Sequence, residues 1–325
     1  MEFRPLGSTG ISVSAVSFGA GPVSGLMTGS TQDRQVAVVR RAIESGINWF
    51  DTAATYGGGQ SEQSLGAAFA AIGRPADVHI ATKVRLMPEH LGDIGKQVRK
   101  SFAESLLRLG VARVTLLQLH NSITPNRGDE PTSITPEDIL GPGGVLEAFE
   151  RLRSDGLVEQ LGLTGIGNPE SLRLVVRSGK FATMQIPYHI LNPSAGEVMP
   201  EGFAETNYGN VISDCAEMGM GVFAIRVFAG GALLDQEPSA HTLKTPFFPL
   251  ALYERDRARS LALSKHLGNA RLEELAVRFV LSHRALSSAI IGFGDPAHVD
   301  SAVESAAAGG LSNELLAAIR AFPRD

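Results

Sequence analysis

Cysteine is almost absent from this chain of 325 residues, in which Cys215 is the only one. A single thiol excludes an intrachain disulfide, and it also excludes a zinc site built on several thiolates. The residues around Cys215 form a helix-like run, so we expect this side chain to pack inside the protein. No two histidines combine a metal-ligand spacing with a carboxylate partner, and we expect no metal site.

Long apolar runs are also missing. No stretch approaches the roughly 20 apolar residues that span a bilayer, and the first residues lack the charged leader and apolar segment of a secretory signal. The formal net charge is only −5, so nothing favours nucleic acid or an anionic membrane as a partner. We therefore expect a cytoplasmic protein that acts on a small molecule. No feature selects an oligomeric state.

What the chain does contain is an alternation of short apolar segments with amphipathic stretches. Eight predicted strands cover residues 14–18, 48–51, 79–83, 114–120, 160–164, 183–188, 221–226 and 288–292. Predicted helices between them include residues 33–45, 92–109, 143–154 and 272–282. This alternation indicates parallel βα units. Eight units without a linker predict an α/β fold, a single (β/α)8 TIM barrel that forms one domain over residues 1–325.

Further segments extend this barrel. Residues 3–6 and 11–13 flank a glycine-rich turn and predict an N-terminal β-hairpin that closes the barrel floor. Three connections, at residues 20–31, 121–142 and 229–253, exceed ordinary loop length. Each follows a predicted strand, so we expect long loops on the C-terminal face. An apolar cluster at residues 245–250 either packs against the barrel rim or contacts substrate or cofactor.

Four polar residues stand at or just beyond the ends of predicted strands. Asp51, Lys83 and His120 end three of them, and Tyr56 follows Asp51 closely. Strand ends of a parallel barrel converge on one face, where barrel enzymes keep their chemistry. Taken singly, these residues could be a helix cap, a solvated lysine, a rim aromatic and a structural histidine. Their joint placement favours a shared site.

This set suits hydride transfer to a carbonyl, which leaves negative charge on oxygen and needs a proton donor. Tyr56 could supply the proton, and the ammonium of Lys83 would stabilise the resulting phenolate. Asp51 would hold Lys83 charged and in place. His120 could orient the carbonyl oxygen and complete an oxyanion site. No Gly-x-Ser-x-Gly elbow supports a serine hydrolase instead.

The segment D-T-A-A-T-Y-G at residues 51–57, with Ser-Glu at 61–62 and Leu-Gly at 65–66, resembles the signature of the aldo-keto reductase family. The resemblance extends from residues 4–7 to residues 290–292, nearly the whole chain. It implies one (β/α)8 barrel that binds a nicotinamide cofactor without a Rossmann domain. In agreement, no convincing Gly-x-Gly-x-x-Gly follows a predicted strand. It also implies the roles given above for the four polar residues.

Cofactor contacts follow from the same resemblance. Gln185 matches the family's glutamine that hydrogen-bonds the nicotinamide carboxamide. Thr164 and Gly165 replace the family's serine–asparagine pair, and this Thr-Gly pair resembles a branch that includes L-galactose and related aldose 1-dehydrogenases. Thr164 can still donate or accept a hydrogen bond, whereas Gly165 cannot replace asparagine. Gly21, in the first long loop, is a further expected contact.

The seventh predicted strand departs from the family, in which an aromatic ring there often stacks on nicotinamide. Ile225 takes that place and Arg226 follows it. Phe228 or Tyr188 could supply a ring instead. Arg226 could hold a pyrophosphate or a polar substrate, or it could form a surface ion pair.

The choice between NAD and NADP depends on residues 292–298. Main-chain groups around Gly292, Phe293 and Gly294, with the helix N-terminus that follows, can hold a phosphate of either cofactor. NADP-dependent members usually offer basic residues here. This chain has Asp295, and His298 stands where an arginine is common. A dianionic phosphate near Asp295 would be poorly compensated, so the segment favours NAD.

The leading hypothesis is therefore an NAD(P)-dependent oxidoreductase that oxidises an aldose or similar polar alcohol to a lactone or carbonyl. One alternative is an NADPH-dependent reductase of aldehydes and ketones. Another is a cofactor-sensing regulatory subunit, comparable to the potassium-channel β subunits of the family.

Overall fold

The computed structural model describes residues 1–323 and contains a closed barrel of parallel strands. The strands lie in the order β10-β3-β4-β5-β6-β7-β8-β9. They are β3 (Val16–Gly19), β4 (Trp49–Asp51), β5 (His79–Val84), β6 (Val114–Leu119), β7 (Val158–Thr164), β8 (Thr183–Pro187), β9 (Gly221–Ile225) and β10 (Leu286–Ile291). Helices cover such a sheet from outside, so its strands are short continuous apolar runs. The predicted (β/α)8 barrel is confirmed.

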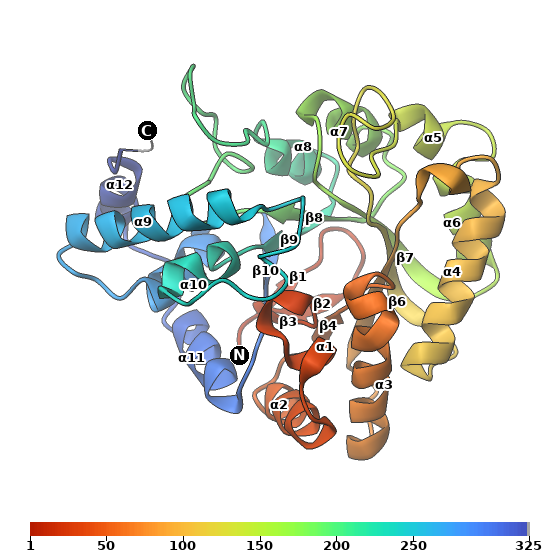
Figure 1. The fold of residues 1–325 in the computed structure, drawn as a ribbon, viewed down its shortest axis with the longest axis horizontal. Coiled ribbons are helices and arrows are strands. Elements are labelled where there is room, and N and C mark those ends of the chain that lie inside the picture. Colours follow the sequence, from red (N-terminus) through yellow and green to blue (C-terminus); the bar gives the residue numbers. More distant parts are fainter. Residues whose placement is uncertain (324–325) are drawn as a thin grey trace.

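A helix follows each barrel strand, and Figure 1 shows these helices surrounding the strands. They are α2 (Gln32–Glu44), α3 (Gln60–Ile72), α4 (Ile94–Leu109), α6 (Val145–Ser154), α7 (Pro169–Val176), α8 (Val211–Glu217), α10 (Leu272–Ser282) and α11 (Pro296–Ala307). Two of the predicted helices begin later than expected. The Asp93 carboxylate accepts a hydrogen bond from the Lys96 amide, and this cap makes α4 begin at Ile94.

The N-terminal hairpin closes the floor of the barrel, as predicted. Strands β1 (Phe3–Pro5) and β2 (Ser12–Ser14) are antiparallel, with Phe3 opposite Ser14. Leu6 and Val13 are buried against side chains from the barrel interior, including Trp49 and Phe223. The Trp49 and Phe223 rings lie 4.8 Å apart between centroids. This apolar plug fills the lower interior of the barrel.

Strand boundaries differ from the prediction at both ends of the barrel. Ser14 was assigned to the first barrel strand but ends the hairpin, where its amide donates to Asn48 Oδ1 at 2.8 Å and its hydroxyl donates to Val16 O at 2.7 Å. These bonds stabilise the bend from hairpin to barrel. The last strand begins at Leu286 and ends at Ile291. Gly292 therefore lies in the loop beyond it.

The three long predicted loops contain short helices. They are η1 (Pro22–Ser24) and α1 (Leu26–Gly29) in the first loop, α5 (Pro136–Leu140) in the second and η4 (Ala229–Leu234) in the third. Another short helix, η3 (Pro88–His90), follows β5. A further long connection, residues 188–210, joins β8 to α8 and was not predicted. The structure thus adds irregular chain on the C-terminal face.

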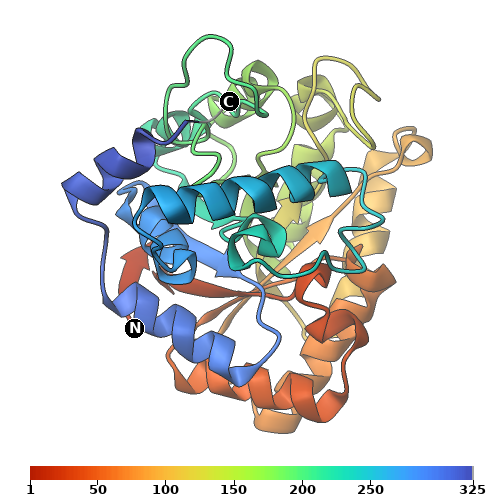
Figure 2. The same cartoon turned by 60° about the vertical axis from the view of Figure 1, so that its left-hand side comes forward.

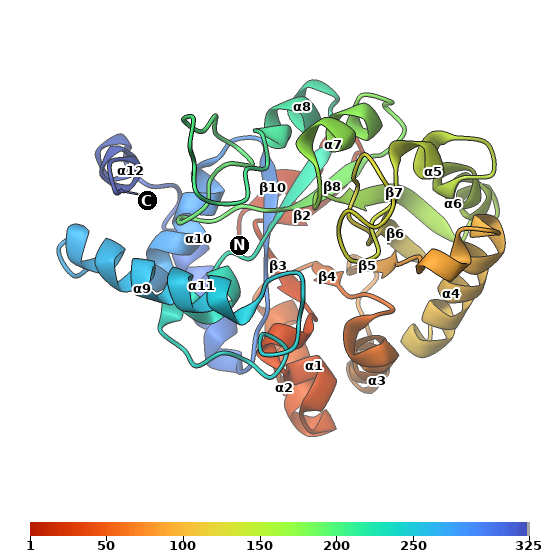
Figure 3. The same ribbon diagram turned by 45° about the horizontal axis from the view of Figure 1, so that its top comes forward.

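Two helices escaped the sequence analysis, α9 (Leu250–His266) and α12 (Asn313–Arg320). Figure 2 shows α9 running across the molecule beside η4. Figures 1 and 3 place α9 and α12 on the side of the barrel opposite α4 and α6. Within residues 1–323, no helix is long and apolar enough to cross a membrane. The single domain over 1–325 stays a prediction, and its last two residues lie outside the described part.

Candidate active site

A buried ion pair forms the base of the site at the C-terminal ends of β4 and β5. Lys83 Nζ donates to Asp51 Oδ2 at 2.5 Å and to the main-chain oxygen of Thr52 at 2.9 Å. The Asp51 Oδ1 atom accepts from the side-chain amides of Gln118 at 3.1 Å and Gln185 at 2.5 Å. Three side chains from three other strands thus fix one carboxylate.

The charge of Lys83 is maintained by its neighbours. Its side chain has no exposed surface. Burial alone lowers the pKa of Lys83, but Asp51 and Tyr56 together raise this pKa above its usual value. The ammonium therefore stays charged although it is fully buried, and it also donates to the Tyr56 Oη at 3.2 Å. The hydrogen bonds link Asp51, Lys83 and Tyr56 in a continuous chain.

A glycine run places Tyr56 at the end of that chain. Tyr56 opens the short helix η2 (Tyr56–Gly59), which leads directly into α3. Gly57, Gly58 and Gly59 all have positive φ, at 59°, 62° and 95°. Only glycine adopts three such conformations in succession without steric penalty. The glycines after Tyr56 therefore turn the chain sharply and leave the phenol at the barrel end.

His120 completes the group beside Tyr56. The two rings meet edge to face with centroids 5.5 Å apart. Burial and the positive charges of Arg85 and Lys83 lower the pKa of His120 well below its usual value. The imidazole is therefore neutral at physiological pH. Its Nδ1 lies 3.2 Å from Thr55 Oγ1. If that hydroxyl donates, the ring proton resides on Nε2, which becomes a hydrogen-bond donor.

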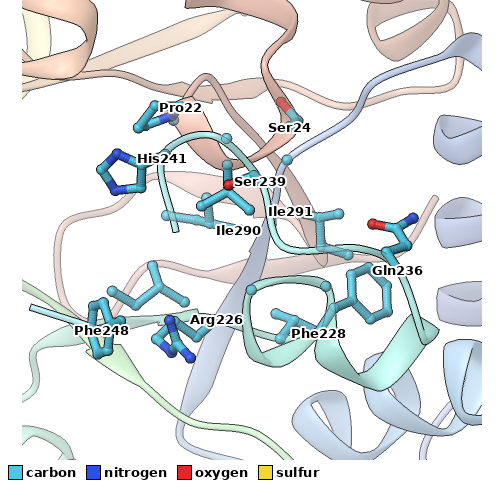
Figure 4. Close-up of a pocket in the computed structure, with 18 of the residues that line it drawn as sticks. Pro22, Ser24, Arg226, Phe228, Gln236, Ser239, His241, Phe248, Ile290 and Ile291 are labelled. Atoms are coloured by element: carbon cyan, nitrogen blue, oxygen red, sulfur yellow. The ribbon is translucent and has the colours of Figure 1, made fainter. Parts of the chain in front are cut away.

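A large cavity opens above this group. Its volume is about 1410 Å³, and Asp51, Tyr56 and His120 line it, while Lys83 lies behind them. Sites for one drug-sized ligand typically occupy roughly 300–1,000 Å³. The cavity therefore has room for a dinucleotide together with a small substrate. Figure 4 shows part of its wall, where the first long loop, β10 and the segment after β9 converge.

Nine of the residues expected to contact the cofactor line this cavity. They are Gly21, Thr164, Gln185, Arg226, Phe228, Gly292, Phe293, Gly294 and His298. The structure adds detail for two of them. The Thr164 hydroxyl donates to Leu119 O at 2.9 Å, so its lone pairs stay open to accept a bond. The Phe293 ring is buried 5.6 Å from that of Phe18, so only the Phe293 backbone can face a cofactor.

The cavity wall fits a dinucleotide because glycines leave its backbone accessible. A Cβ atom placed on Gly21 would lie 3.8 Å from the Tyr56 ring, and one on Gly292 would lie 3.5 Å from Ser24. At the far end, Asp295 caps α11 by accepting from the Ala297 amide at 3.0 Å. The Gly294 amide donates to His298 Nδ1 at 3.3 Å. Bare backbone beside Tyr56 and Ser24 leaves room for a dinucleotide, whereas the first amides at the α11 end are already bonded within the protein.

Arg34 is a basic group at this end that the sequence did not reveal. It comes from α2, donates from Nε to Gly294 O at 3.0 Å and lies 3.7 Å from the Asp295 carboxylate. No motif marks this residue, because α2 and residues 294–295 are far apart in the chain. Arg34 is thus already engaged by Asp295.

Two alternatives left open for the seventh strand are not met in the structure. Tyr188 does not line the cavity; its ring is buried and stacks on Phe279 at 5.3 Å. Arg226 is no surface residue, since 13% of its side chain is exposed and it lies 3.7 Å from Asp256. Its guanidinium lies 4.0 Å from the Phe248 ring centroid, and Figure 4 shows the two side by side. The apolar cluster at 245–250 thus faces the cavity.

Sequence reasoning also missed two cavity residues near His120. Arg85 and Ser122 both line the cavity. Arg85 stands two residues after Lys83, and Ser122 two residues after His120. Both lie just beyond strand ends, Val84 of β5 and Leu119 of β6, and this position at the C-terminal ends of the barrel strands was the signal that could have found them. Within residues 1–323, no group of three or more His, Cys, Asp or Glu residues could hold a metal ion.

Comparisons with known proteins agree with this arrangement. Residues 15–323 match the sequence profile of the Aldo/keto reductase family. The chain is 29% identical to L-galactose dehydrogenase of Arabidopsis thaliana, over 99% of this chain and 94% of that protein. It is 28% identical to D-threo-aldose 1-dehydrogenase of a Pseudomonas species, over 92% and 91%. The holo structure of aldo-keto reductase AKR11C1 from Bacillus halodurans superposes with a TM-score of 0.73 at 22% identity, over 99% and 96%.

Proposed function

Because this chain belongs to the aldo/keto reductase family, whose members are nicotinamide-dependent oxidoreductases, we propose that it oxidises an aldose or similar polar alcohol to a lactone or carbonyl. The observation that carries the proposal is the chain of hydrogen bonds from Asp51 through Lys83 to Tyr56, which ends at a large cavity. The substrate class is supported by the names of two relatives that match nearly the full length, both sugar dehydrogenases.

Tyr56 is the proposed proton-transfer group. In oxidation, its phenolate accepts the proton of the substrate hydroxyl, and in reduction the phenol returns it. The ammonium of Lys83 stabilises the phenolate, and Asp51 keeps that ammonium in place. A neutral His120 donates from Nε2 to the substrate oxygen and so holds it beside Tyr56. A bound nicotinamide supplies the hydride acceptor or donor.

The proposed cofactor contacts divide along the cavity. Thr164, as an acceptor, and Gln185 would hold the carboxamide, and Arg226 would hold the pyrophosphate. Gly21 would leave space beside Tyr56. The Phe228 ring would pack along the cofactor, and the backbone at 292–294 with His298 would receive the adenosine end. All of these residues line the same cavity as Asp51, Tyr56 and His120.

We propose NAD as the preferred cofactor. The Asp295 carboxylate caps α11 and lies 3.7 Å from the Arg34 guanidinium. A 2′-phosphate near this place would meet a negative charge, and it would have to compete for the arginine. One observation favours the alternative of an NADPH-dependent reductase. Arg34 contacts Gly294 O and His298 lines this end of the cavity, and displacement of Asp295 would free Arg34 for a phosphate.

Initial rates of nicotinamide reduction test this function. A panel of aldoses would be assayed with NAD and NADP in parallel, and NADPH oxidation would be followed with aromatic aldehydes. We expect turnover of at least one aldose with NAD at a higher kcat/KM than with NADP. Aldehyde reduction by NADPH without any sugar oxidation would replace the proposal by the reductase alternative.

A further inference from the structure

Arg85 places a cation next to the proposed reacting atoms. It follows β5 two residues after Lys83, and its Nε donates to His120 O at 3.2 Å. The guanidinium carbon lies 4.8 Å from the ring centroid of Phe247. Arg85 lines the same cavity as Tyr56 and His120. The backbone of the histidine and the aromatic ring therefore fix the guanidinium at the substrate end.

This cation has no counter-ion in the described part of the chain. Other partly buried arginines do, because Arg108 pairs with Glu62 at 2.7 Å and Arg226 lies 3.7 Å from Asp256. Arg85 forms no ion pair within residues 1–323, where its contacts are a carbonyl and a ring. Of the described acidic groups, only Tyr56, when ionised, acts on its charge. Arginine stays charged in proteins, and a partly buried charge without a partner is unfavourable. A ligand anion would supply the missing partner.

Ser122 adds an unsatisfied hydroxyl to the same region. It is 2% exposed, lines the cavity, and its Oγ has no hydrogen-bond partner in the described chain. The side chain of Asn121 ties its segment to that of Arg85, accepting from Leu86 N at 2.8 Å and donating to Leu86 O at 2.7 Å. A buried hydroxyl without a partner is costly unless a ligand satisfies it.

We propose that Arg85 and Ser122 form a carboxylate subsite beside His120, so that the preferred substrates are sugar acids rather than neutral sugars. The aldose part of this inference rests on the proposed function, and the carboxylate part rests on the subsite alone. Because Nε is bound to His120 O, both terminal nitrogens of Arg85 remain to grip a carboxylate in bidentate fashion. The single positive charge of one guanidinium neutralises a carboxylate monoanion. It would neutralise only half of the charge of a phosphate dianion, so a carboxylate is the better fit.

Binding measured without turnover tests the subsite directly. Tyr56→Phe protein saturated with NAD would be titrated calorimetrically with glucuronate and galacturonate, and with glucose and galactose as their neutral parents. We expect a uronate to bind about 10- to 100-fold more tightly than its parent, the range of a charge-assisted hydrogen bond. Adding Arg85→Met should abolish this preference, Arg85→Lys should retain part of it, and Ser122→Ala should weaken uronate binding several-fold.

Arg99→Met is the matched control, because this arginine lies on α4 with 60% of its side chain exposed. It should leave the uronate preference unchanged, and thermal melts should show that each variant is folded. Equal binding of uronate and parent, a preference that survives Arg85→Met, or tighter binding of a sugar phosphate would each overturn the subsite.

The subsite and the proposed function can fail separately. Suppose that the uronate preference depends on Arg85 but that the unmodified protein oxidises no sugar. This result would support the subsite and refute aldose oxidation. In that case 4-carboxybenzaldehyde should be reduced faster than 4-methylbenzaldehyde, and Arg85→Met should remove the difference. Equal rates for this pair would count against the subsite in the active enzyme as well.

Discussion

Asp51 and Lys83 show how a buried charge pair constrains the site. Both side chains are almost completely buried and meet at 2.5 Å. Removal of one partner leaves an uncompensated charge, which typically costs about 3–5 kcal/mol. We expect Lys83→Met and Asp51→Asn each to lower the free energy of unfolding by an amount of this order.

The same pair should be non-additive. We expect the double variant Asp51→Asn/Lys83→Met to be less destabilised than the sum of the single variants by at least about 1 kcal/mol. Urea unfolding of all four proteins measures this coupling. Strict additivity would mean that the two groups do not stabilise each other.

Asp256 predicts a pH dependence of stability. Burial raises the pKa of Asp256 to about 6, although Arg226 and Arg255 oppose the rise. The native state therefore binds this proton more tightly than the unfolded chain, where an Asp has a pKa of about 3.9. The stabilisation that the bound proton of Asp256 contributes is complete below about pH 4. It is lost as the pH rises through about 6.

The side chain of the Asp256→Asn variant cannot ionise. The variant should therefore not lose this part of the free energy of unfolding as the pH rises. Relative to the unmodified protein, the variant should gain roughly 2–3 kcal/mol in free energy of unfolding between about pH 4 and pH 8. Denaturant melts across this range provide the measurement. A difference that does not change with pH would contradict the raised pKa.

At this scale, sequence patterns revealed residues that end strands but not residues that meet across the fold. Asp51, Lys83 and His120 could be grouped because parallel strand ends converge, and the structure does bring them together with Tyr56. Arg34 was invisible because its partner at 294–295 is remote in the chain. Tyr188 was one of two residues that could supply a ring to the cavity, yet its ring is buried against Phe279 of α10.

Helix packing makes two glycines behave in opposite ways. Gly66 lies inside α3, where an added Cβ would come within 2.7 Å of the main-chain oxygens of Arg108 and Leu109. Gly95 lies in α4, and its Cβ would meet nothing within 4 Å. Helix propensity alone favours alanine over glycine in a helix interior by about 1 kcal/mol, and Gly95 lies in the first turn of α4, where the difference is smaller.

We therefore expect Gly66→Ala to lower the free energy of unfolding by about 1–3 kcal/mol through overpacking. Gly95→Ala should raise it by about 0.5–1 kcal/mol. Chemical denaturation of the two variants, which carry the same substitution, compares packing with propensity. Stabilisation by both alanines would show that α3 and α4 are not in close contact at Gly66.

The prediction of helices and strands succeeded where apolar residues recur with a clear helical or strand spacing. The predicted helix at 272–282 coincides with α10, and the barrel strands were found because both of their faces are buried. Helix α9 was missed because its apolar residues follow no helical stripe: only Tyr253 and Leu263 among them are buried. Helix α9 packs against η4, and its Ser260 hydroxyl donates a hydrogen bond to Ala232 O at 3.0 Å. No local sequence pattern indicates this contact.

For the whole molecule, the barrel was predictable because eight βα units without a linker have few other closed arrangements. The course of the loops above it was not, because irregular chain follows tertiary contacts. Arg85 on Phe247 and Arg226 on Phe248 hold residues 235–249 over the cavity from two sides of the barrel. Neither arginine–ring pair has a sequence signal.

Cofactor choice is a property of this whole assembly, since α2, β10 and α11 meet at the proposed adenosine end. A ligand that binds only the native state at 100 times its Kd adds about 2.7 kcal/mol to stability. We expect NAD to raise the Tm more than NADP at equal concentration. Asp295→Asn, which keeps a capping side chain but removes the charge, should narrow that gap. A larger Tm increase with NADP in the unmodified protein would reverse the assignment.

The most direct test of the account compares Tyr56→Phe with the unmodified protein in sugar oxidation and in cofactor binding. We expect kcat to fall by about 10²–10⁴-fold, the usual contribution of a proton-transfer group. Cofactor affinity, measured by fluorescence titration, should stay within a factor of about two, because the Tyr56 hydroxyl hydrogen-bonds Lys83 and not the proposed cofactor contacts. Near-normal turnover in this variant would contradict the assignment of Tyr56 and, with it, the proposed chemistry.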